Sequence, residues 1–583
     1  MNKITLQIYF MVFLHFTGFL ILNGQQSQSK ITGEKVVLFS DRTLYITGEQ
    51  ILFSAFLQSE VETNQVEMSR VLYCELIAPD GNKIAGNKYL IKNSSAFGYL
   101  TIPKDIITGI YYLRAYTKFM RNSGPLYYHY TGIKIVNPKR NEVRAITDNN
   151  YLSEGLSGEE NPEKTRDSFL ISPDKSQYVT RDTVHISVEG IETNQSSWKG
   201  LSLAVVPEFS ISANKVRLSE NIQFEKRVFY YPETRGLSIT GKLTDSATGN
   251  ILPLIRINLS IIGKGRDFMA MQTDTAGRFF FSLPDYTGSR DLFLSAENIS
   301  TSTPKILVDN DYCTLPVHIL SNNFTLTKQE REVAFKMSVN LQLGSYFNKD
   351  SISDVLNYQG QDQAFYGKPN EILYIDNYIQ LPTLEEYFNE LVTLVKVRKH
   401  QGKKYFRVLG TQSGLIDFDP LTLVDLVAID DPSKVLAISP INISRIEVVN
   451  MLYVKGDQTY GGIINIITKN GDFGGIDLPS SGVFINYGFL ADSSHYPGIY
   501  PLPIHYPDTR NTLYWEPQLK LNKDNSTKIS FTVSDTPGKY LIILNGINSK
   551  GETFRQTSTI EVIKYQMSQA IKDKVRTPTQ SSD

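Results

Sequence analysis

The sequence predicts a mainly β, multi-domain protein, in which tandem β-sandwiches are followed by an α+β domain and a C-terminal β domain. Three observations support this prediction. The chain has 583 residues, enough for about four domains of roughly 150 residues that each bury a core. It contains 33 Tyr and 30 Phe together with frequent Val, Ile and Thr, which favour strands. Short segments of alternating apolar and polar residues recur along most of its length.

The N-terminus has the layout of a secretory signal. Lys3 precedes an apolar run over residues 4–22, and small and polar residues follow it. We therefore expect residues 1–25 to be a signal peptide, cleaved near Gly24 or Gln25, and the protein to be exported. The alternative is an uncleaved anchor, because the run approaches the roughly 20 apolar residues that span a bilayer.

Charge and cysteine content exclude some classes of protein. The chain has 59 Lys and Arg against 60 Asp and Glu, so nothing in its overall charge favours a nucleic-acid partner. Its two cysteines, Cys74 and Cys313, lie far apart in what we expect to be different domains. A disulfide framework is therefore not expected, and stability must come from packing.

The first unit covers residues 34–138. Its apolar runs alternate with turn residues at the spacing of a β-sandwich. Near its start, Asp41, Tyr45, Gly48 and Glu49 form a D-x-x-x-Y-x-x-G-E pattern. This pattern resembles the opening of the macroglobulin module of the alpha-2-macroglobulin superfamily, and the resemblance implies a macroglobulin-like sandwich.

A second, weaker copy of this unit is expected over residues 167–224. A polar linker, residues 139–166, precedes it. Asp174, Tyr178 and Asp182 then repeat the spacing of the first pattern, and a later apolar run supplies a further strand. The sequence therefore predicts two macroglobulin-like modules in tandem.

Residues 238–298 form a different β unit. A turn from Asp274 to Gly277 separates two apolar strands, and Asp-x-x-Gly is a favourable turn sequence. The unit resembles the carboxypeptidase regulatory-like domain, a small sandwich that also precedes outer-membrane receptors. This resemblance implies a fold and no particular chemistry.

Residues 326–475 are expected to form an α+β domain with a preceding strand and helix. Apolar residues at every second position from Val333 to Leu341 predict a strand within 326–347. Residues 383–397 have an apolar face and predict a helix, with Thr383 and Glu386 as a capping box.

Three ordered blocks lie at the end of this domain: Leu-Thr-Leu-Val-Asp ending at Asp425, Ile-Glu-Val around Glu447, and Tyr-Gly-Gly followed by alternating Ile up to Lys469. They resemble the plug domain of TonB-dependent outer-membrane receptors, although Leu426 and Gly462 depart from the family pattern. Only 108 residues follow residue 475, too few for a barrel of about 22 strands. The resemblance therefore implies a plug-like domain without a pore of its own.

The remainder is predicted to form a loop region and a β-sandwich over residues 476–565, followed by a disordered tail, residues 566–583. His505, Asp508, Arg510 and Trp515 cluster in this sequence and are candidates for contact with a partner. The alternative, which we favour, is that Asp508 and Arg510 tie a loop together while Trp515 packs on the sandwich.

Tyr127 and Tyr128 are a second candidate pair for partner contact. An exposed aromatic stripe would suit recognition, but an aromatic edge that covers a sheet is the favoured alternative. Neither group of residues suggests catalysis.

The sequence contains no thioester motif, no H-E-x-x-H zinc motif and no G-x-S-x-G elbow. We therefore expect no enzymatic activity and no cofactor. The order of the modules resembles an envelope protein family of Bacteroidota. This resemblance implies a non-catalytic adaptor or plug-like accessory, located in the periplasm or on the periplasmic face of the outer membrane, with outer-membrane transport or secretion proteins as partners. A carbohydrate- or peptide-binding protein is the alternative, and a macroglobulin-like protease-interacting protein without a thioester is a remote one.

Overall fold

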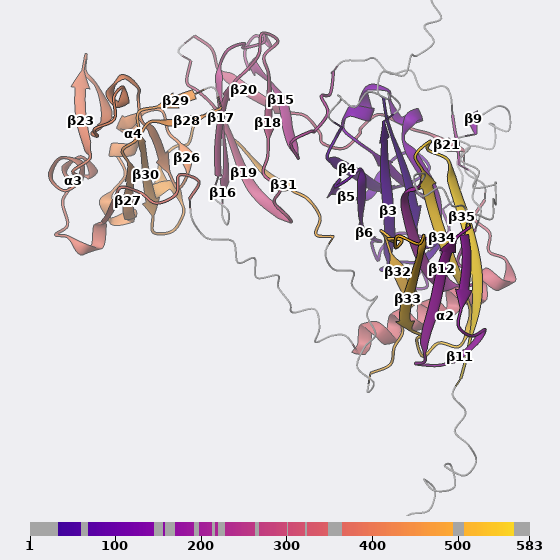
Figure 1. Ribbon diagram of the computed structural model, residues 1–583. Helices are drawn as coiled ribbons and strands as arrows, with labels where there is room; N and C mark the ends of the chain where they lie inside the picture. Colours follow the sequence, from indigo (N-terminus) through magenta and orange to yellow (C-terminus); the bar gives the residue numbers. More distant parts are fainter. Residues whose placement is uncertain are drawn as a thin grey trace, which may run out of the picture.

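The computed structural model confirms a mainly β, multi-domain chain (Figure 1). It describes residues 33–59, 68–144, 156–157, 169–191, 198–212, 216–219, 228–262, 267–299, 301–320, 323–347, 364–456, 458–493 and 506–564. The expected signal peptide, the expected tail and most of the linker lie outside these residues. No helix within these ranges is long and apolar enough to cross a membrane.

Module 1, residues 34–136, is a sandwich of two sheets. The first sheet has the order β1 (Glu34–Ser40), β3 (Gln50–Ser59), β6 (Ser95–Thr101). The second has the order β2 (Leu44–Ile46), β8 (His129–Val136), β7 (Gly109–Tyr116), β4 (Val71–Ile77), β5 (Lys83–Leu90). Two 3₁₀ turns, η1 (Phe119–Asn122) and η2 (Pro125–Tyr127), connect β7 to β8.

The D-x-x-x-Y-x-x-G-E pattern of module 1 is a hydrogen-bonded turn. The Tyr45 hydroxyl donates to Asp41 Oδ1 at 2.6 Å, and the Glu49 carboxylate accepts from the Ile46 backbone N–H at 2.7 Å. Gly48 has a φ of 91°, a conformation that side chains disfavour, which explains a glycine at this position. The pattern thus sets the entry from β2 into β3.

The same turn recurs where the second copy was predicted. The Tyr178 hydroxyl donates to Asp174 Oδ1 at 2.6 Å, and Asp182 accepts from the Val179 backbone N–H at 3.0 Å. The backbone N–H eleven residues after each Asp also donates to it, from Leu52 in module 1 and from His185 here. The sequence repeat is therefore also a structural repeat.

The second copy does not form a sandwich from residues 167–224 alone. The chain supplies only β10 (Phe169–Pro173), β11 (Gln177–Val179), β12 (Thr183–Gly190) and β13 (Trp198–Pro207) there. The C-terminal strands complete it: β32 (Tyr514–Glu516), β33 (Ser526–Thr532), β34 (Gly538–Asn548) and β35 (Thr553–Ile563).

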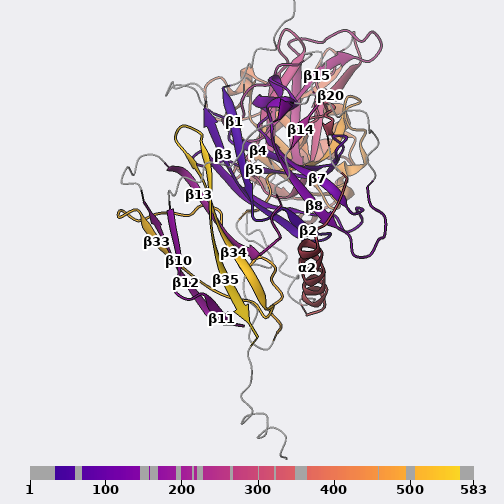
Figure 2. The ribbon, with the colours of Figure 1, turned by 90° about the vertical axis from the view of Figure 1, so that its right-hand side faces the viewer.

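These strands form two sheets, with the orders β10-β12-β33 and β11-β35-β34-β13-β32. The prediction of separate sandwiches at 167–224 and 476–565 is therefore corrected to one module 2, residues 169–207 and 514–563, because β13 pairs with β34 along nearly its full length. Figure 2 shows the yellow C-terminal strands lying among the purple ones.

A third sandwich, which we call the middle sandwich, is formed by segments that lie in sequence between the two halves of module 2. One sheet has the order β18 (Arg278–Ser282), β15 (Ser238–Asp245), β20 (Pro304–Val308). The other has the order β17 (Asp267–Gln272), β16 (Arg256–Ile262), β19 (Ser289–Ala296), β31 (Val483–Gly488). The unit predicted over 238–298 therefore needs β20 and β31 as well, and β31 comes from the segment that had been assigned to the C-terminal domain.

The α+β domain, residues 371–475, is inserted between β20 and β31. Its sheet has the order β22 (Glu371–Tyr374), β27 (Ile443–Val449), β30 (Ile463–Thr468), β25 (Leu421–Val424), β26 (Val427–Ala428), with β25 parallel to β30. Two short helices lie around this sheet, α3 (Leu384–Glu390) and α4 (Pro432–Leu436). Two hairpins accompany them: β23 (Val395–His400) pairs with β24 (Lys403–Val408), and β28 (Tyr453–Lys455) pairs with β29 (Gln458–Tyr460). The domain also has four 3₁₀ turns among its described residues: η3 (Ile375–Asn377), η4 (Leu415–Asp417), η5 (Pro440–Asn442) and η6 (Phe473–Gly475).

Leu426, which departs from the plug pattern, lies in the turn between β25 and β26. Asp425 and Leu426 have φ values of 47° and 70°, as a two-residue hairpin turn requires, and the Asp425 carboxylate holds the turn by accepting from the Thr468 N–H at 2.8 Å. The Leu426 side chain is buried with Phe268 of β17, and its carbonyl accepts from Ser260 at 2.8 Å. Leu426 therefore docks the α+β domain on the middle sandwich.

The prediction of a strand within 326–347 is wrong, because this segment forms the helix α2 (Lys328–Phe347). Thr327 and Glu330 form a capping box: Thr327 Oγ1 accepts from the Glu330 N–H and the Glu330 carboxylate accepts from the Thr327 N–H. The alternating apolar residues separate into two helical stripes. Met337 is buried with Leu44 and Ile46 of β2, whereas Phe335 is exposed.

The helix predicted over 383–397 ends early, at Glu390. Thr383 caps α3 as expected, by accepting from the Glu386 N–H at 3.3 Å. The Glu371 carboxylate then accepts from the N–H groups of Thr393 and Leu394, so these donors no longer need helical partners. Val395 and the residues that follow it pair instead with β24.

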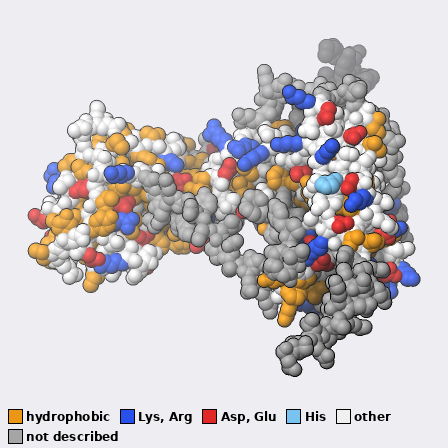
Figure 3. All heavy atoms as spheres, turned by 60° about the horizontal axis from the view of Figure 1, so that its bottom comes forward, with side chains coloured by type: hydrophobic (Ala, Val, Ile, Leu, Met, Phe, Trp, Pro, Cys, Tyr) orange, Lys and Arg blue, Asp and Glu red, His pale blue; other side chains and the backbone are white. Residues whose placement is uncertain are grey.

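The molecule has two lobes (Figures 1 and 3). Modules 1 and 2 and α2 form the larger lobe. The middle sandwich and the α+β domain form the smaller lobe, which we call the arm. A small sheet, β21 (Ile319–Leu320), β14 (Arg217–Leu218), β9 (Leu156–Ser157), lies beside module 1. The cores of module 1 and the middle sandwich are continuous, and a buried ion-pair cluster crosses their junction: Lys118 lies 3.3 Å from both Glu233 and Asp311, and Lys88 also contacts Asp311.

Candidate functional site

The loop before β32 is fixed by one buried ion pair. The Arg510 guanidinium donates to Asp508 from Nε at 2.8 Å and from Nη2 at 2.7 Å, and both side chains are buried. Arg510 also donates to the carbonyls of Leu513 and Thr532. It therefore joins the start of β32 to the end of β33, as the favoured interpretation of this loop predicted.

A second ion pair extends this arrangement to the repeated turn of module 2. Arg181 donates to both carboxylate oxygens of Asp535 at 2.6 Å, and Asp535 also accepts from the Asp508 N–H at 2.8 Å. The hydrogen bond from Arg181 holds the pKa of the Asp535 carboxyl below its usual value. Asp508, Arg510 and Asp535 thus form one hydrogen-bonded network that links the loop before β32 to the end of β33.

Trp515 lies on β32 where module 2 meets module 1. Its side chain is 5% exposed and is buried with Leu52 of module 1 and with Ala204 and Ile543 of module 2. It therefore presents no open ring face of the kind that stacks on a sugar. The indole N–H is buried and has no hydrogen-bond partner among the residues that the structure describes.

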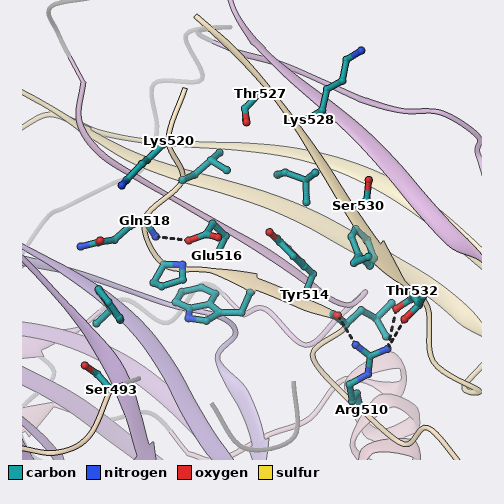
Figure 4. A pocket seen from close by; sticks show the side chains of 17 residues that line it. Ser493, Arg510, Tyr514, Glu516, Gln518, Lys520, Thr527, Lys528, Ser530 and Thr532 are labelled. Carbon is teal, nitrogen blue, oxygen red and sulfur yellow. Dashed lines mark hydrogen bonds between the residues drawn. The ribbon is translucent and has the colours of Figure 1, made fainter. Parts of the chain in front are cut away.

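Arg510 and Trp515 border a groove of about 1060 Å³ (Figure 4). Its two long walls are β32 with the residues that follow it and β33, and Phe97 of module 1 and Ser493 also line it. Both β32 and β33 are the last strands of their sheets, and both lie on the same side of module 2. The groove therefore runs between two sheet edges, and its volume is at the upper end of the about 300–1,000 Å³ typical of ligand clefts.

The groove is lined by positively charged, negatively charged and neutral polar residues. Glu516 and Gln518 come from the β32 side, and Lys528 and Ser530 come from β33, where both are exposed. Lys520 is also exposed at this wall. Figure 4 shows Glu516 and Gln518 on one wall and Lys528 and Ser530 on the other, with the Lys528 side chain pointing outward from β33. Hydrogen-bonding and charged groups thus stand on both walls of the groove.

Tyr514 forms part of the apolar floor. Its ring stacks on Phe531 at a centroid distance of 5.3 Å. Burial, together with the Glu516 carboxylate, raises the pKa of the Tyr514 hydroxyl to about 12. The phenol therefore stays neutral near pH 7 and can donate or accept a hydrogen bond at the edge of the groove.

The tyrosine pair in module 1 lies elsewhere. Tyr128 is buried, its ring stacks on Tyr116 at 4.3 Å, and its hydroxyl contacts Cys313 Sγ at 3.4 Å. Tyr127 is half-buried in η2. The favoured alternative, an aromatic edge that covers a sheet, describes this geometry.

The structure therefore brings Arg510 and Trp515 to the groove, with Asp508 beneath Arg510, while His505 lies outside the described residues. Glu516, Lys520, Lys528 and Ser530 also line the groove and were not predicted from the sequence. The signal for Lys528 and Ser530 was the alternation of apolar and polar residues along 526–532, which marks an outer strand face. Among the described residues, no three His, Cys, Asp or Glu side chains are grouped so as to hold a metal ion.

No protein-family model matches this sequence, and no curated protein matches it. Among solved structures, the chain is similar to trypsin-activated alpha-2-macroglobulin from Escherichia coli, with 9% identity, a TM-score of 0.23, and coverage of 92% of this chain and 42% of that one. It is also similar to native E. coli alpha-2-macroglobulin, with 10% identity, a TM-score of 0.23, and coverage of 92% of this chain and 40% of that one.

A further similar structure is Salmonella alpha-2-macroglobulin reacted with methylamine, with 9% identity and a TM-score of 0.23. That match covers 91% of this chain and 40% of the Salmonella chain. The chain therefore spans less than half the length of these proteins.

Proposed function

We propose that this chain is a non-catalytic binding protein of the cell envelope that acts as an adaptor for an outer-membrane transport or secretion complex. Its binding site is the groove between β32 and β33, and its ligand is an extended segment of the partner protein. The observation that carries the proposal is the pair of neighbouring sheet edges with a cleft between them.

β33 is the better template of the two edges. It has seven residues, whereas β32 has three and is followed by Pro517, which has no N–H to donate. An added strand would gain main-chain hydrogen bonds along one side and place alternate side chains over the groove. Ile529 and Phe531 of β33 are buried in the core of module 2, and this packing fixes the position of the strand.

The charges at the groove favour acidic side chains on that segment. Lys520 and Lys528 are exposed there, while Glu516 is the one acidic side chain among the described lining residues. Arg510 is already neutralised by Asp508. Attraction between the lysines and an acidic segment would select the partner and speed its association.

The test is site-specific photo-crosslinking in cells. A photoreactive amino acid replaces Ser530, which is exposed on β33, and a matched chain carries it at Thr559, which is exposed on β35. We expect an adduct with an outer-membrane protein from position 530, none of comparable yield from position 559, and loss of the adduct in a K520E/K528E variant. Equal adducts from both positions, or monomer alone from position 530, would refute the proposal.

A further inference from the structure

The hairpin of β23 and β24 is the most basic segment of the described chain. Its 14 residues, 395–408, include six Lys and Arg and one His but no Asp or Glu, in a protein whose overall counts are 59 Lys and Arg against 60 Asp and Glu. Gln401 and Gly402 close it with φ values of 48° and 83°, the geometry of a tight two-residue turn. In Figure 1, β23 lies at the outer end of the arm, away from modules 1 and 2.

Strand register divides the hairpin into two faces. On one face, Val395 pairs with Val408 and Val397 with Phe406, and these side chains belong to the core beside α3. The other face has three cross-strand pairs: Lys396 with Arg407, Arg398 with Tyr405, and His400 with Lys403. The outward face therefore consists of cationic or titratable side chains and one tyrosine.

Like charges directly opposite each other on neighbouring strands repel. Two of the six basic side chains have a nearby acid: Arg407 Nη1 lies 2.5 Å from Asp419, and Lys404 Nζ lies 2.5 Å from Glu385 of α3. For Lys396, Arg398 and Lys403 no ion pair with a described carboxylate exists, and Arg398 and Lys403 are exposed. An anionic partner would remove this repulsion.

We propose that the outward face of this hairpin, which we call the basic ribbon (Lys396, Arg398, His400, Lys403, Tyr405 and Arg407), docks on a lipid surface that carries anionic phosphate headgroups. This inference goes beyond the proposed groove function and stands on a different part of the chain. Each Lys or Arg that approaches such a surface adds to the attraction, which falls off within a Debye length.

The composition of the basic ribbon favours a charged surface over a protein partner. Specific protein interfaces are built around buried aromatic and apolar residues and are depleted in Lys. The hairpin instead buries its apolar side chains against its own domain and exposes Lys and Arg at its tip.

The rest of the α+β domain disfavours nucleic acid. Outside the hairpin, residues 364–476 contain 13 Asp and Glu against five Lys and Arg. A long polyanion that followed the protein surface would meet this acidic region within a few nucleotides of the basic ribbon. A planar lipid surface would touch only the protruding hairpin.

The test uses the full chain and vesicles of 70% phosphatidylcholine and 30% phosphatidylglycerol, with pure phosphatidylcholine vesicles as the neutral reference, in a flotation assay at 0.1 M salt. We compare the wild type with a K396Q/R398Q/K403Q variant. The matched control, K305Q/K550Q/K564Q, removes three exposed lysines from the middle sandwich and module 2.

We expect the wild type and the control variant to float with the anionic vesicles and not with the neutral ones, and 0.5 M salt to release them. The partition coefficient of the ribbon variant should fall by roughly 100-fold, as the loss of three surface-bound charges implies. Equal thermal unfolding of all three proteins checks that the fold is intact.

Any of three flotation results would overturn the proposal: equal binding to neutral vesicles, no difference between the ribbon variant and the wild type, or equal loss in the control variant. If an oligonucleotide of random sequence competes the protein off the vesicles at nanomolar concentration, nucleic acid is the better partner and the proposal is again overturned.

Discussion

The Thr512 hydroxyl donates a 2.7 Å hydrogen bond to the buried Asp41 carboxylate, although 471 positions separate the two residues. Next to it, Asn511 donates to Glu49 at 2.7 Å. Both acceptors belong to the D-x-x-x-Y-x-x-G-E turn of module 1, and both donors belong to the loop that supports the groove. The turn pattern therefore shapes module 1 and also anchors the C-terminal segment on it.

Replacing Thr512 by Val should destabilise the protein. The side chain keeps its shape but leaves Asp41 with one donor fewer inside the core, at a cost of about 1–3 kcal/mol. Denaturant unfolding followed by tryptophan fluorescence measures this, because Trp515 lies three residues away. Thr559→Val, on the exposed face of β35, is the control and should leave the midpoint unchanged. An unchanged midpoint for Thr512→Val would contradict the anchoring role.

Replacing Gly200 by Ala should weaken the contact between modules 1 and 2. A Cβ at this position would lie 1.9 Å from Cε1 of Phe56, whose ring is buried with Val37 and Ile547. Such overpacking costs about 1–3 kcal/mol.

The control for this change is Gly488→Ala. A Cβ at Gly488 meets nothing within 4 Å, so this variant should be neutral or slightly more stable. Limited proteolysis of the two variants compares them: faster cleavage is expected only for Gly200→Ala, and equal cleavage rates would count against the contact.

The two stripes of α2 predict opposite results for two alanine substitutions. Met337 is 1% exposed against β2, so Met337→Ala should lower stability by about 2–5 kcal/mol. Phe335 is 71% exposed, so Phe335→Ala should change it by less than about 0.5 kcal/mol. Thermal unfolding measures both. Equal losses would mean that residues 328–347 do not lie on β2 through this face.

Stability should fall in acid partly through Asp311. Burial opposes ionisation, but Lys118 and Lys88 outweigh it and hold the pKa of the Asp311 carboxyl below its usual value. A carboxyl whose pKa is lower in the folded state stabilises the fold above its unfolded pKa of about 3.9, and this contribution is lost as the pH falls through the folded value.

Calorimetry of Asp311→Asn tests this expectation. The gap in melting temperature between wild type and variant should be full above about pH 5 and should shrink as the pH falls below about 4. Asp105→Asn, an exposed side chain, serves as the control. A gap that stays constant from pH 6 to pH 3 would show that the ion pairs of Asp311 add nothing.

The sequence by itself determined the local features of this protein. Composition and alternation were enough for the β class, because each strand shows its buried face within a few residues. Short patterns were enough for the turn of Asp41 and Tyr45 and its repeat at Asp174 and Tyr178, because their hydrogen bonds join residues three to eleven positions apart. The favoured role of Asp508 and Arg510 was local in the same way.

Only the tertiary structure decided what depends on distant partners. The pairing of β13 with β34 joins two segments that were predicted as separate sandwiches. The sequence of a strand does not specify which strand it pairs with, here one about 340 residues away. The alternation in α2 fits a strand and two helical stripes equally well, and the capping box with the contact to β2 selects the helix. The groove exists because two sheet edges from distant segments meet, so Lys528 and Ser530 acquire a common neighbourhood with Glu516 only after folding.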